Sequence, residues 1–269
     1  MKIFLTGGTG FIGFYVLRDA LAAGYEVVAL RRTVSSRSIL PLPSEPHWLE
    51  RDLLALEPKD LYGCSAVVHL ASAGVSPQQV PWHELVQVNV MGAAHLIDIA
   101  RQAGVKRFVV SGTCHEYGAS ATRMDDIHSD APLEPLTLYG ASKAASFHLL
   151  SAYARSQGME LYYARIFNVY GEGQYEKNFW PSLQAAARQG VDFPMTTGDQ
   201  LCDFVPVEKV AESLLAACTQ PLSGSGDPVV KNIRSGRPQS LLSFAQKEWK
   251  KSGAVGKLLP GAMPLRHSQ

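Results

Sequence analysis

At 269 residues the chain is long enough for one large α/β domain, or for one domain with a small appendage. Its 25 basic and 24 acidic residues leave a formal charge of +1, so we expect neither nucleic acid nor a membrane surface as a partner. The beginning of the chain is a short apolar run broken by glycines, which is unlike a signal peptide or a membrane span, and we expect a cytoplasmic protein. We expect reduced thiols and no metal site, because no CxxC pair occurs among the cysteines, Cys64, Cys114, Cys202 and Cys218.

Strands and helices alternate along most of the chain. Apolar runs predict strands at residues 2–5, 25–30, 65–70, 107–111, 160–166 and 229–233. Apolar residues at helical spacing predict helices at 11–23, 82–103, 137–157 and 208–219. This alternation predicts an α/β fold with a doubly wound parallel sheet of the Rossmann type. We expect residues 1–170 to form a dinucleotide-binding domain, to which a later strand can contribute, and residues 171–269 to form mainly a small, discontinuous substrate-binding lobe.

A glycine-rich turn follows the first predicted strand. In the stretch TGGTGFIG (6–13), Gly7 allows a tight turn, Gly10 lets backbone approach a pyrophosphate, and Gly13 lets the helix pack on the strand. The N-terminus of the following helix offers free N–H groups and a partial positive charge to phosphates. The turn therefore predicts a dinucleotide site, the alternative being a glycine turn without a ligand.

Two arginines stand where the second strand ends. Arg31 and Arg32 occupy the position, about 20 residues beyond the glycine turn, at which an acidic residue binds the adenosine ribose in NAD-binding proteins. An acid there repels a 2′-phosphate, whereas arginine can bind it through a charge-assisted contact. We therefore expect NADP(H) to be preferred, with NAD(H) possible. The alternative is two solvated arginines at a strand end.

A tyrosine and a lysine lie four residues apart in a predicted helix. Tyr139 and Lys143 in YGASK (139–143) therefore project from one helix face. A phenol titrates near pH 10, and a nearby ammonium lowers that pKa, so Tyr139 could transfer a proton near neutral pH. Thr113, at the end of another strand, could hydrogen-bond the same substrate oxygen.

These motifs together resemble an extended short-chain dehydrogenase/reductase, in the NAD-dependent epimerase/dehydratase family that acts on nucleotide-linked sugars. The resemblance runs through most of the chain and is carried by TGGTGFIG (6–13), the pair Asp52 and Leu53, HLAS (69–72), VNVMGAAHL (88–96), SGTCHEYG (111–118), YGASK (139–143), RIFNVYG (165–171) and DFVPVEKVA (203–211).

The resemblance implies roles for particular residues. Tyr139 would transfer the proton, Lys143 would lower its pKa and bind the nicotinamide ribose, and Thr113 would orient the sugar oxygen. Contacts with the cofactor would come from Gly7, Gly10, Phe11, Ile12, Gly13, Arg31, Arg32, Asp52, Leu53, Leu70, Ala71, Asn89, Ser111, Tyr139, Lys143 and Ile166. Contacts with the substrate would come from Thr113, His115, Asn168, Asn178 and Arg266. A homodimer through helices around 85–103 and 137–157 is also implied.

Two departures from the family pattern bear on the reaction. Sugar 4,6-dehydratases carry Asp-Glu after the hydroxyl residue, whereas this chain has Cys114 and His115, which disfavours dehydration. Cys202 stands where an arginine usually grips the diphosphate, which weakens but does not exclude a nucleoside-diphosphate substrate.

Several functions remain open at this point. We expect an NADPH-dependent reductase of a nucleoside-diphosphate 4-keto-6-deoxyhexose, and the main alternative is an NAD-dependent nucleotide-sugar 4-epimerase. Reduction of a non-nucleotide carbonyl compound and a non-catalytic sensor or scaffold of the same fold are further alternatives.

Overall fold

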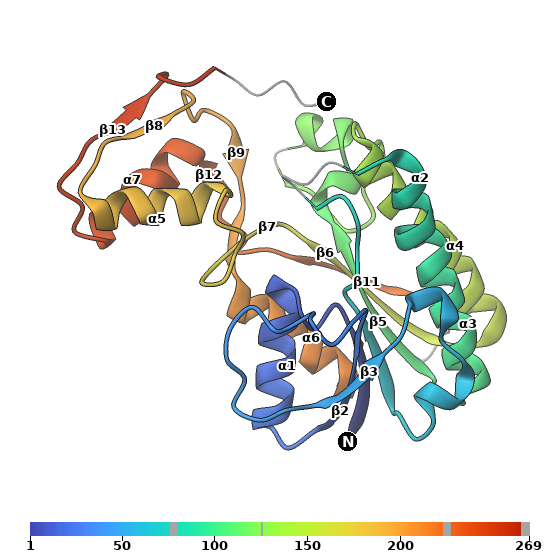
Figure 1. Cartoon of the computed structure of the whole chain (residues 1–269). Coiled ribbons are helices and arrows are strands. Elements are labelled where there is room, and N and C mark those ends of the chain that lie inside the picture. The colour runs from blue at the N-terminus through green and yellow to red at the C-terminus, as the bar shows by residue number, and fades with distance from the viewer. Residues whose placement is uncertain (76–79, 125, 223–226, 265–269) are drawn as a thin grey trace. The chain divides into compact units, whose positions relative to one another are not determined.

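The computed structural model describes residues 1–75, 80–124, 126–222 and 227–264. Its contacts divide the chain into two compact units (Figure 1). The first comprises Met1–Ile166 and Glu208–Ile233, and the second comprises Phe167–Val207 and Arg234–Gln269. Each unit is described by itself below.

The first unit is built on a parallel sheet. Its seven strands in the described part of the chain follow the order β11-β6-β5-β4-β1-β2-β3, and every neighbouring pair is parallel. The prediction of a doubly wound parallel sheet is therefore confirmed. The strands are β1 (Lys2–Thr6), β2 (Glu26–Arg31), β3 (His47–Glu50), β4 (Ala66–His69), β5 (Arg107–Thr113), β6 (Glu160–Ile166) and β11 (Val229–Ile233).

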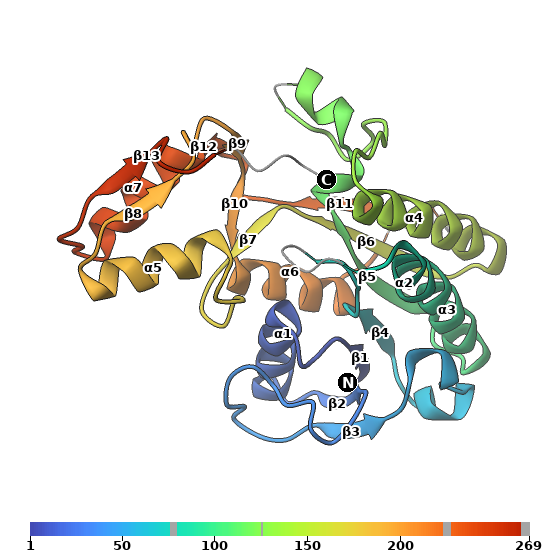
Figure 2. The ribbon, with the colours of Figure 1, turned by 45° about the horizontal axis from the view of Figure 1, so that its top comes forward.

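Helices cover both faces of this sheet. Figure 2 shows α1 (Phe11–Ala22) and α6 (Val207–Thr219) on one face, with α2 (Trp82–Leu85), α3 (Ala93–Gln102) and α4 (Leu138–Gln157) on the other. The helix expected at 82–103 is not uniform, because a π-helical stretch, η3 (Val86–Gly92), separates α2 from α3. Shorter 3₁₀ turns are η1 (Leu53–Ala55), η2 (Pro58–Leu61), η4 (Cys114–Glu116) and η5 (Ala119–Arg123).

The sequence pattern did not predict strand β3. Among the strands that the structure describes, this one pairs only with β2, so it lies at the edge of the sheet. Its two central residues, Trp48 and Leu49, are half-buried and its ends are exposed. A four-residue edge strand with one partner gives too weak an apolar pattern to be recognised.

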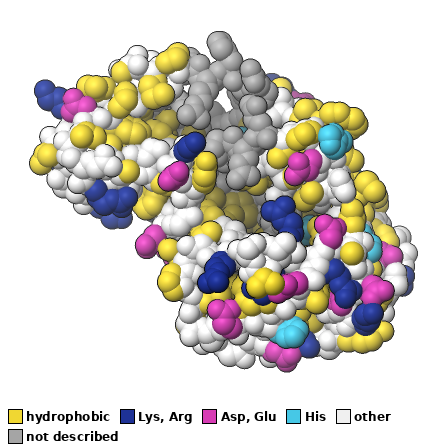
Figure 3. All heavy atoms as spheres, in the orientation of Figure 1, with side chains coloured by type: hydrophobic (Ala, Val, Ile, Leu, Met, Phe, Trp, Pro, Cys, Tyr) yellow, Lys and Arg dark blue, Asp and Glu magenta, His cyan; other side chains and the backbone are white. Residues whose placement is uncertain are grey.

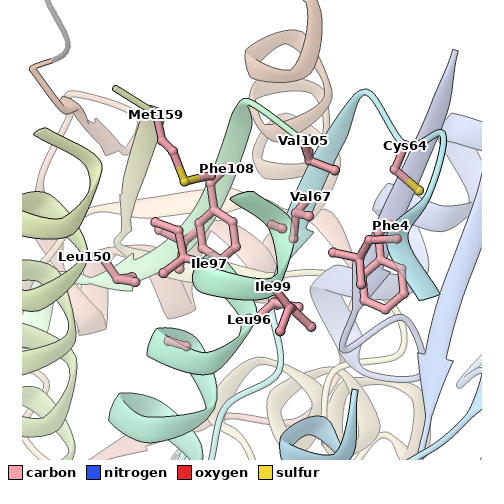
Figure 4. Packing of buried hydrophobic residues seen from close by; sticks show 14 of the residues in the cluster. Phe4, Cys64, Val67, Leu96, Ile97, Ile99, Val105, Phe108, Leu150 and Met159 are labelled. Atoms are coloured by element: carbon pink, nitrogen blue, oxygen red, sulfur yellow. The ribbon is translucent and has the colours of Figure 1, made fainter. Parts of the chain in front are cut away.

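One core cluster of the first unit lies between the sheet and helices α3 and α4. Phe4, Val67 and Phe108 point from β1, β4 and β5 toward Leu96 of α3 and Leu150 of α4, and all five are buried (Figure 4). At about 25 cal/mol per Å² of buried apolar surface, such contacts are the main force holding the helices to the sheet. Because all the strands are parallel, their carboxyl ends lie along one edge of the sheet, and the packed core holds that edge in place.

The second unit has its own small core. Its strand pairs are β7 (Asn168–Tyr170) with β10 (Phe204–Pro206), β8 (Phe193–Met195) with β13 (Leu258–Pro260), and β9 (Leu201–Cys202) with β12 (Gln239–Ser240). Helices α5 (Phe179–Gln189) and α7 (Leu241–Lys251) bury Leu183, Ala245 and Trp249. In this unit Phe204 and Phe244 stack with ring centroids 3.7 Å apart.

The surface mixes both signs of charge. On the face shown in Figure 3, basic and acidic side chains are interspersed among hydrophobic ones. Across the described ranges, no helix is both long enough and apolar enough to cross a membrane.

Candidate active site

The glycine turn between β1 and α1 has the shape that a pyrophosphate requires. Gly7 has a φ of +76°, and a Cβ on Gly13 would lie 2.0 Å from the Gly7 carbonyl oxygen. Gly10 is exposed, and a Cβ there would meet only the Gly7 oxygen, at 3.3 Å. Open space thus lies in front of Gly10, beside Phe11 and Ile12, whose amides belong to the first turn of α1. These residues fit a dinucleotide cofactor.

The two arginines at the end of β2 differ in their surroundings. The Nη2 of Arg31 lies 2.6 Å from Glu50 Oε1, and its guanidinium stands over the Trp48 ring at 5.2 Å. Among the described residues, Arg31 Nε is a buried donor without a hydrogen-bond partner. Arg32 is exposed. Arg31 is therefore held by Glu50 and Trp48 of β3.

A threonine and a histidine shape the loop after β4. Thr6 Oγ1 accepts hydrogen bonds from the backbone N–H groups of Leu70 and Ala71, each at 3.2 Å, and lies 2.7 Å from His69 Nδ1. Burial, aided by the charge of Lys143, lowers the pKa of His69 to about 3. The ring is therefore neutral at physiological pH, and the loop that carries Leu70 and Ala71 is fixed to β1.

Asn89 lies inside the π-helical stretch and is buried. Its Oδ1 accepts hydrogen bonds from Ala73 N–H at 2.8 Å and from Ser72 Oγ at 3.0 Å. Its Nδ2 donates to the Ala73 carbonyl at 3.1 Å and to Ser142 Oγ at 2.9 Å. Since the whole amide is used inside the protein, Asn89 joins the loop after β4 to helix α4. π-Helical stretches often occur at functional sites.

Tyr139 and Lys143 share one face of α4, and both are perturbed by burial. Burial raises the pKa of Tyr139 to about 12, although hydrogen bonds with Ser72 and Thr113 oppose the shift. Burial lowers the pKa of Lys143 to about 8, against the opposing charge of Glu116. We expected a lowered pKa for the phenol, and that expectation is wrong for the protein alone. Removing the phenolate from water outweighs the hydrogen bonds with Ser72 and Thr113, which act in the opposite direction.

Thr113 ends β5 and begins the turn η4. Its Oγ1 accepts a hydrogen bond from His115 N–H at 3.3 Å, and its own N–H donates to Glu116 Oε1 at 2.7 Å. The His115 ring meets the Tyr139 ring edge to face, with centroids 6.3 Å apart, and burial lowers its pKa. A Cβ on Gly140 would lie 2.5 Å from the His115 carbonyl oxygen, so this glycine lets α4 approach η4. Thr113, His115 and Tyr139 are thus brought together.

The remaining predicted residues of the first unit lie near the ends of its strands. Asp52 is exposed and its carboxylate accepts Leu54 N–H at 2.9 Å, while Leu53 packs on Gly92. Ser111 Oγ donates to the His69 carbonyl at 3.4 Å. Ile166 is buried opposite Thr113 in the β5–β6 pairing.

The predicted substrate residues are not all in this unit. Asn168, in β7, and Asn178, which precedes α5, belong to the second unit. Arg266 lies outside the described residues. Their substrate contacts stay predictions.

Three site residues were missed by sequence reasoning. Ser72 hydrogen-bonds both Tyr139 and Asn89, and Glu116 binds both the Thr113 N–H and Arg165. The spacing of Thr113 and Glu116 is that of a capping box, which could have indicated that Glu116 folds back onto Thr113. For Ser72 and Arg165 no local pattern gives such a signal.

Within the described ranges, no group of three His, Cys, Asp or Glu side chains is placed so that it could hold a metal ion. The four cysteines form no disulfide in these ranges.

Comparison with known proteins identifies relatives over nearly the whole chain. The dTDP-glucose 4,6-dehydratase of Neisseria meningitidis is 27% identical over 244 residues, which are 83% of this chain and 69% of that protein. The dTDP-6-deoxy-L-talose 4-dehydrogenase (NAD(+)) of Aggregatibacter actinomycetemcomitans is 25% identical over 254 residues, which are 92% of this chain and 89% of that protein.

Solved structures show the same fold. The structure of MoeE5 in complex with UDP-glucose and NAD has a TM-score of 0.80 and 28% identity, covering 99% of this chain and 88% of that one. The NAD-dependent NDP-hexosamine 5,6-dehydratase TunA, involved in tunicamycin biosynthesis, has a TM-score of 0.83 and 30% identity, covering 98% of this chain and 85% of that one. Residues 3–231 match a family profile, and with the glycine turn and the Tyr139–Lys143 helix in place, the chain belongs to the NAD dependent epimerase/dehydratase family.

Proposed function

We propose that this chain is an NADPH-dependent reductase of a nucleoside-diphosphate 4-keto-6-deoxyhexose. The observation that carries the proposal is the hydrogen-bonded contact of the Tyr139 phenol with Thr113, one helical turn from Lys143. This arrangement provides a proton donor, a second hydroxyl group for the same substrate oxygen, and a cation. A bound nicotinamide cofactor supplies the hydride.

The pKa values suit a carbonyl reduction. With its pKa raised to about 12, Tyr139 is protonated at neutral pH and can donate to the developing alkoxide. Lys143, with a pKa of about 8, is mostly charged at pH 7 and stabilises the phenolate that forms when the proton leaves. Thr113 orients the oxygen that receives the proton.

The relatives support the class of substrate. Their names include dTDP-linked and UDP-linked sugars, and one names a 6-deoxyhexose with redox chemistry at C4. Cys114 and His115, which follow Thr113, provide no carboxylate for the elimination of water, so this supports a reductase over a dehydratase.

A second candidate is an NAD-dependent nucleotide-sugar 4-epimerase. The ion pair between Arg31 and Glu50 favours it, because a carboxylate beside Arg31 neutralises the guanidinium and repels a 2′-phosphate. Two UDP-glucose 4-epimerases, from Corynebacterium glutamicum and Azospirillum brasilense, are each 26% identical to this chain. The exposed Arg32 favours NADPH instead, because its guanidinium is accessible to a 2′-phosphate.

The preference for one cofactor can be tested at this ion pair. In Glu50→Gln, Arg31 loses its competing carboxylate, so we expect NADPH to bind roughly tenfold more tightly while NADH changes little. In Arg31→Gln, NADPH should bind roughly tenfold more weakly. Dissociation constants from cofactor fluorescence measure both. Equal affinities for the two cofactors in all three proteins would contradict the clamp and place the epimerase first.

The catalytic assignment can be tested with Tyr139→Phe. Removing the phenolic proton should lower kcat at least ~10²-fold with dTDP-4-keto-6-deoxyglucose and NADPH, because a positioned acid contributes that much. Tyr153→Phe, on the same helix with its hydroxyl on Asp98, is the control and should keep the wild-type rate. A fully active Tyr139→Phe enzyme would refute the assignment of Tyr139 as the proton donor.

A further inference from the structure

A buried ion pair lies directly behind the catalytic group. Glu116 is 0% exposed and Arg165 is 1% exposed, and Arg165 Nε donates to Glu116 Oε2 at 2.8 Å. The guanidinium also stands over the Phe147 ring at 4.4 Å and the Tyr117 ring at 4.9 Å. Arg165 further donates to the Ser129 carbonyl at 2.7 Å. Arg165 therefore fixes the Glu116 carboxylate through its oxygen Oε2.

The second oxygen of Glu116 contacts Thr113 and the hydroxyl group of Tyr163. Oε1 accepts the Thr113 N–H at 2.7 Å and lies 3.0 Å from the Tyr163 hydroxyl. That hydroxyl is also 3.0 Å from the backbone carbonyl of Lys143. The single proton of the Tyr163 hydroxyl is shared between these two acceptors, so Glu116 and Tyr163 together link the end of β5, which carries Thr113, to the turn of α4 that carries Lys143.

The backbone makes room for this carboxylate. A Cβ on Gly112 would lie 2.5 Å from Glu116 Oε1 and 2.2 Å from a ring carbon of Tyr163. Only glycine at that position lets Glu116 fold back against β5 and β6. The position of the Glu116 carboxylate therefore depends on glycine at residue 112.

We propose that Glu116, held by Arg165, is a positioning residue that fixes Thr113 and Lys143 relative to Tyr139 for proton transfer. The inference rests on the proposed function, in that it takes these three residues as the catalytic group, and it holds for the reductase and the epimerase alike.

Stability of packing alone does not explain why two charged side chains, Glu116 and Arg165, are buried here. A hydrophobic pair of similar volume is often as stable as a buried ion pair, because both charges lose their hydration. A carboxylate does what a hydrophobic side chain cannot, since it accepts the Thr113 N–H and the Tyr163 hydroxyl. Its charge also acts on the site, because it raises the pKa of Lys143 against the lowering by burial.

The test compares two uncharged replacements of the pair. Glu116→Met with Arg165→Met removes the acceptor and leaves no buried charge. Glu116→Gln with Arg165→Gln also removes both charges but keeps an oxygen for the Thr113 N–H. A misplacement near 1 Å can cost ~10²-fold in rate, so we expect kcat of the methionine pair to fall by ~10 to 10²-fold with KM unchanged. The glutamine pair should recover most of that loss.

A second variant covers the case in which the methionine pair does not fold. Tyr163→Phe removes only the hydroxyl between Glu116 and Lys143, and we expect roughly a tenfold lower kcat with KM unchanged. Its control is Tyr162→Phe, whose hydroxyl lies 3.4 Å from Ser213 Oγ on α6, and which should keep the wild-type kcat. Wild-type kcat in a folded methionine pair, or in Tyr163→Phe, would overturn the proposal.

A readout independent of turnover separates this inference from the proposed function. Amide hydrogen exchange at Thr113 should be faster in the folded methionine pair than in the wild type, whereas exchange at Val110, in the middle of β5, should be unchanged. Unchanged exchange at Thr113 would overturn the positioning role. A wild-type protein inactive in both the reductase and the epimerase assay would refute the proposed function and leave this exchange result standing.

Discussion

At the scale of single residues, His69 makes the stability of the fold depend on pH. Its ring is buried against Thr6, and burial lowers its pKa from 6.5 to about 3. In the unfolded chain the ring binds a proton near pH 6.5, whereas in the folded protein it stays neutral until about pH 3. Between these values the unfolded state binds more protons, so the free energy of unfolding must fall as the pH falls.

We expect His69 to contribute about 2 kcal/mol to the loss of stability between pH 7 and pH 5, at about 1.4 kcal/mol per pH unit below pH 6.5. Urea unfolding at the two pH values measures it. His69→Gln should reduce the difference in the free energy of unfolding between pH 7 and pH 5. His148→Gln, at an exposed position, should leave that difference unchanged. An equal pH dependence in wild type and His69→Gln would show that another group causes the loss.

At the scale of elements, the helices on one face of the sheet leave apolar side chains in solvent. Trp82 of α2 is 64% exposed, and Met91 of η3 is 54% exposed. On α4, Leu138 and Leu149 are exposed and lie about three helical turns apart, hence on one face. Exposed apolar groups of this size mark interaction surfaces. We therefore propose that this face, formed by α2, η3 and α4, binds a second copy of the chain.

A charge placed on this face should break the dimer. In Trp82→Asp with Leu138→Asp, each copy would bury two unpaired carboxylates, so we expect only monomer in sedimentation at micromolar concentration, where the wild type should be dimeric. Tyr62→Asp is the control, because Tyr62 is 62% exposed but lies after η2, away from these helices in the sequence. A monomeric wild type would refute the dimer.

At the scale of the whole molecule, the parallel sheet of the first unit gathers residues that are far apart in the chain. Thr6, His69 and Thr113 end the neighbouring strands β1, β4 and β5, so all three lie at the carboxyl edge of the sheet. Helix α4 packs beside them and adds Tyr139 and Lys143. The two units have separate cores. The residues that we propose for cofactor binding and catalysis lie in the first unit, and the predicted substrate residues Asn168 and Asn178 lie in the second.

The sequence by itself determined the alternation of the six buried strands with the long helices of the first unit, the glycine turn and the Tyr139–Lys143 pair, because these follow from local spacing and from the shape of glycine. Only the tertiary structure decided what surrounds each group. The edge strand β3 brings Glu50 to Arg31, and strand β6 brings Arg165 to Glu116. The raised pKa of Tyr139 likewise depends on burial by several segments. Ion pairing and desolvation depend on all the groups that lie nearby in space. They therefore cannot be predicted from the spacing of residues along the chain.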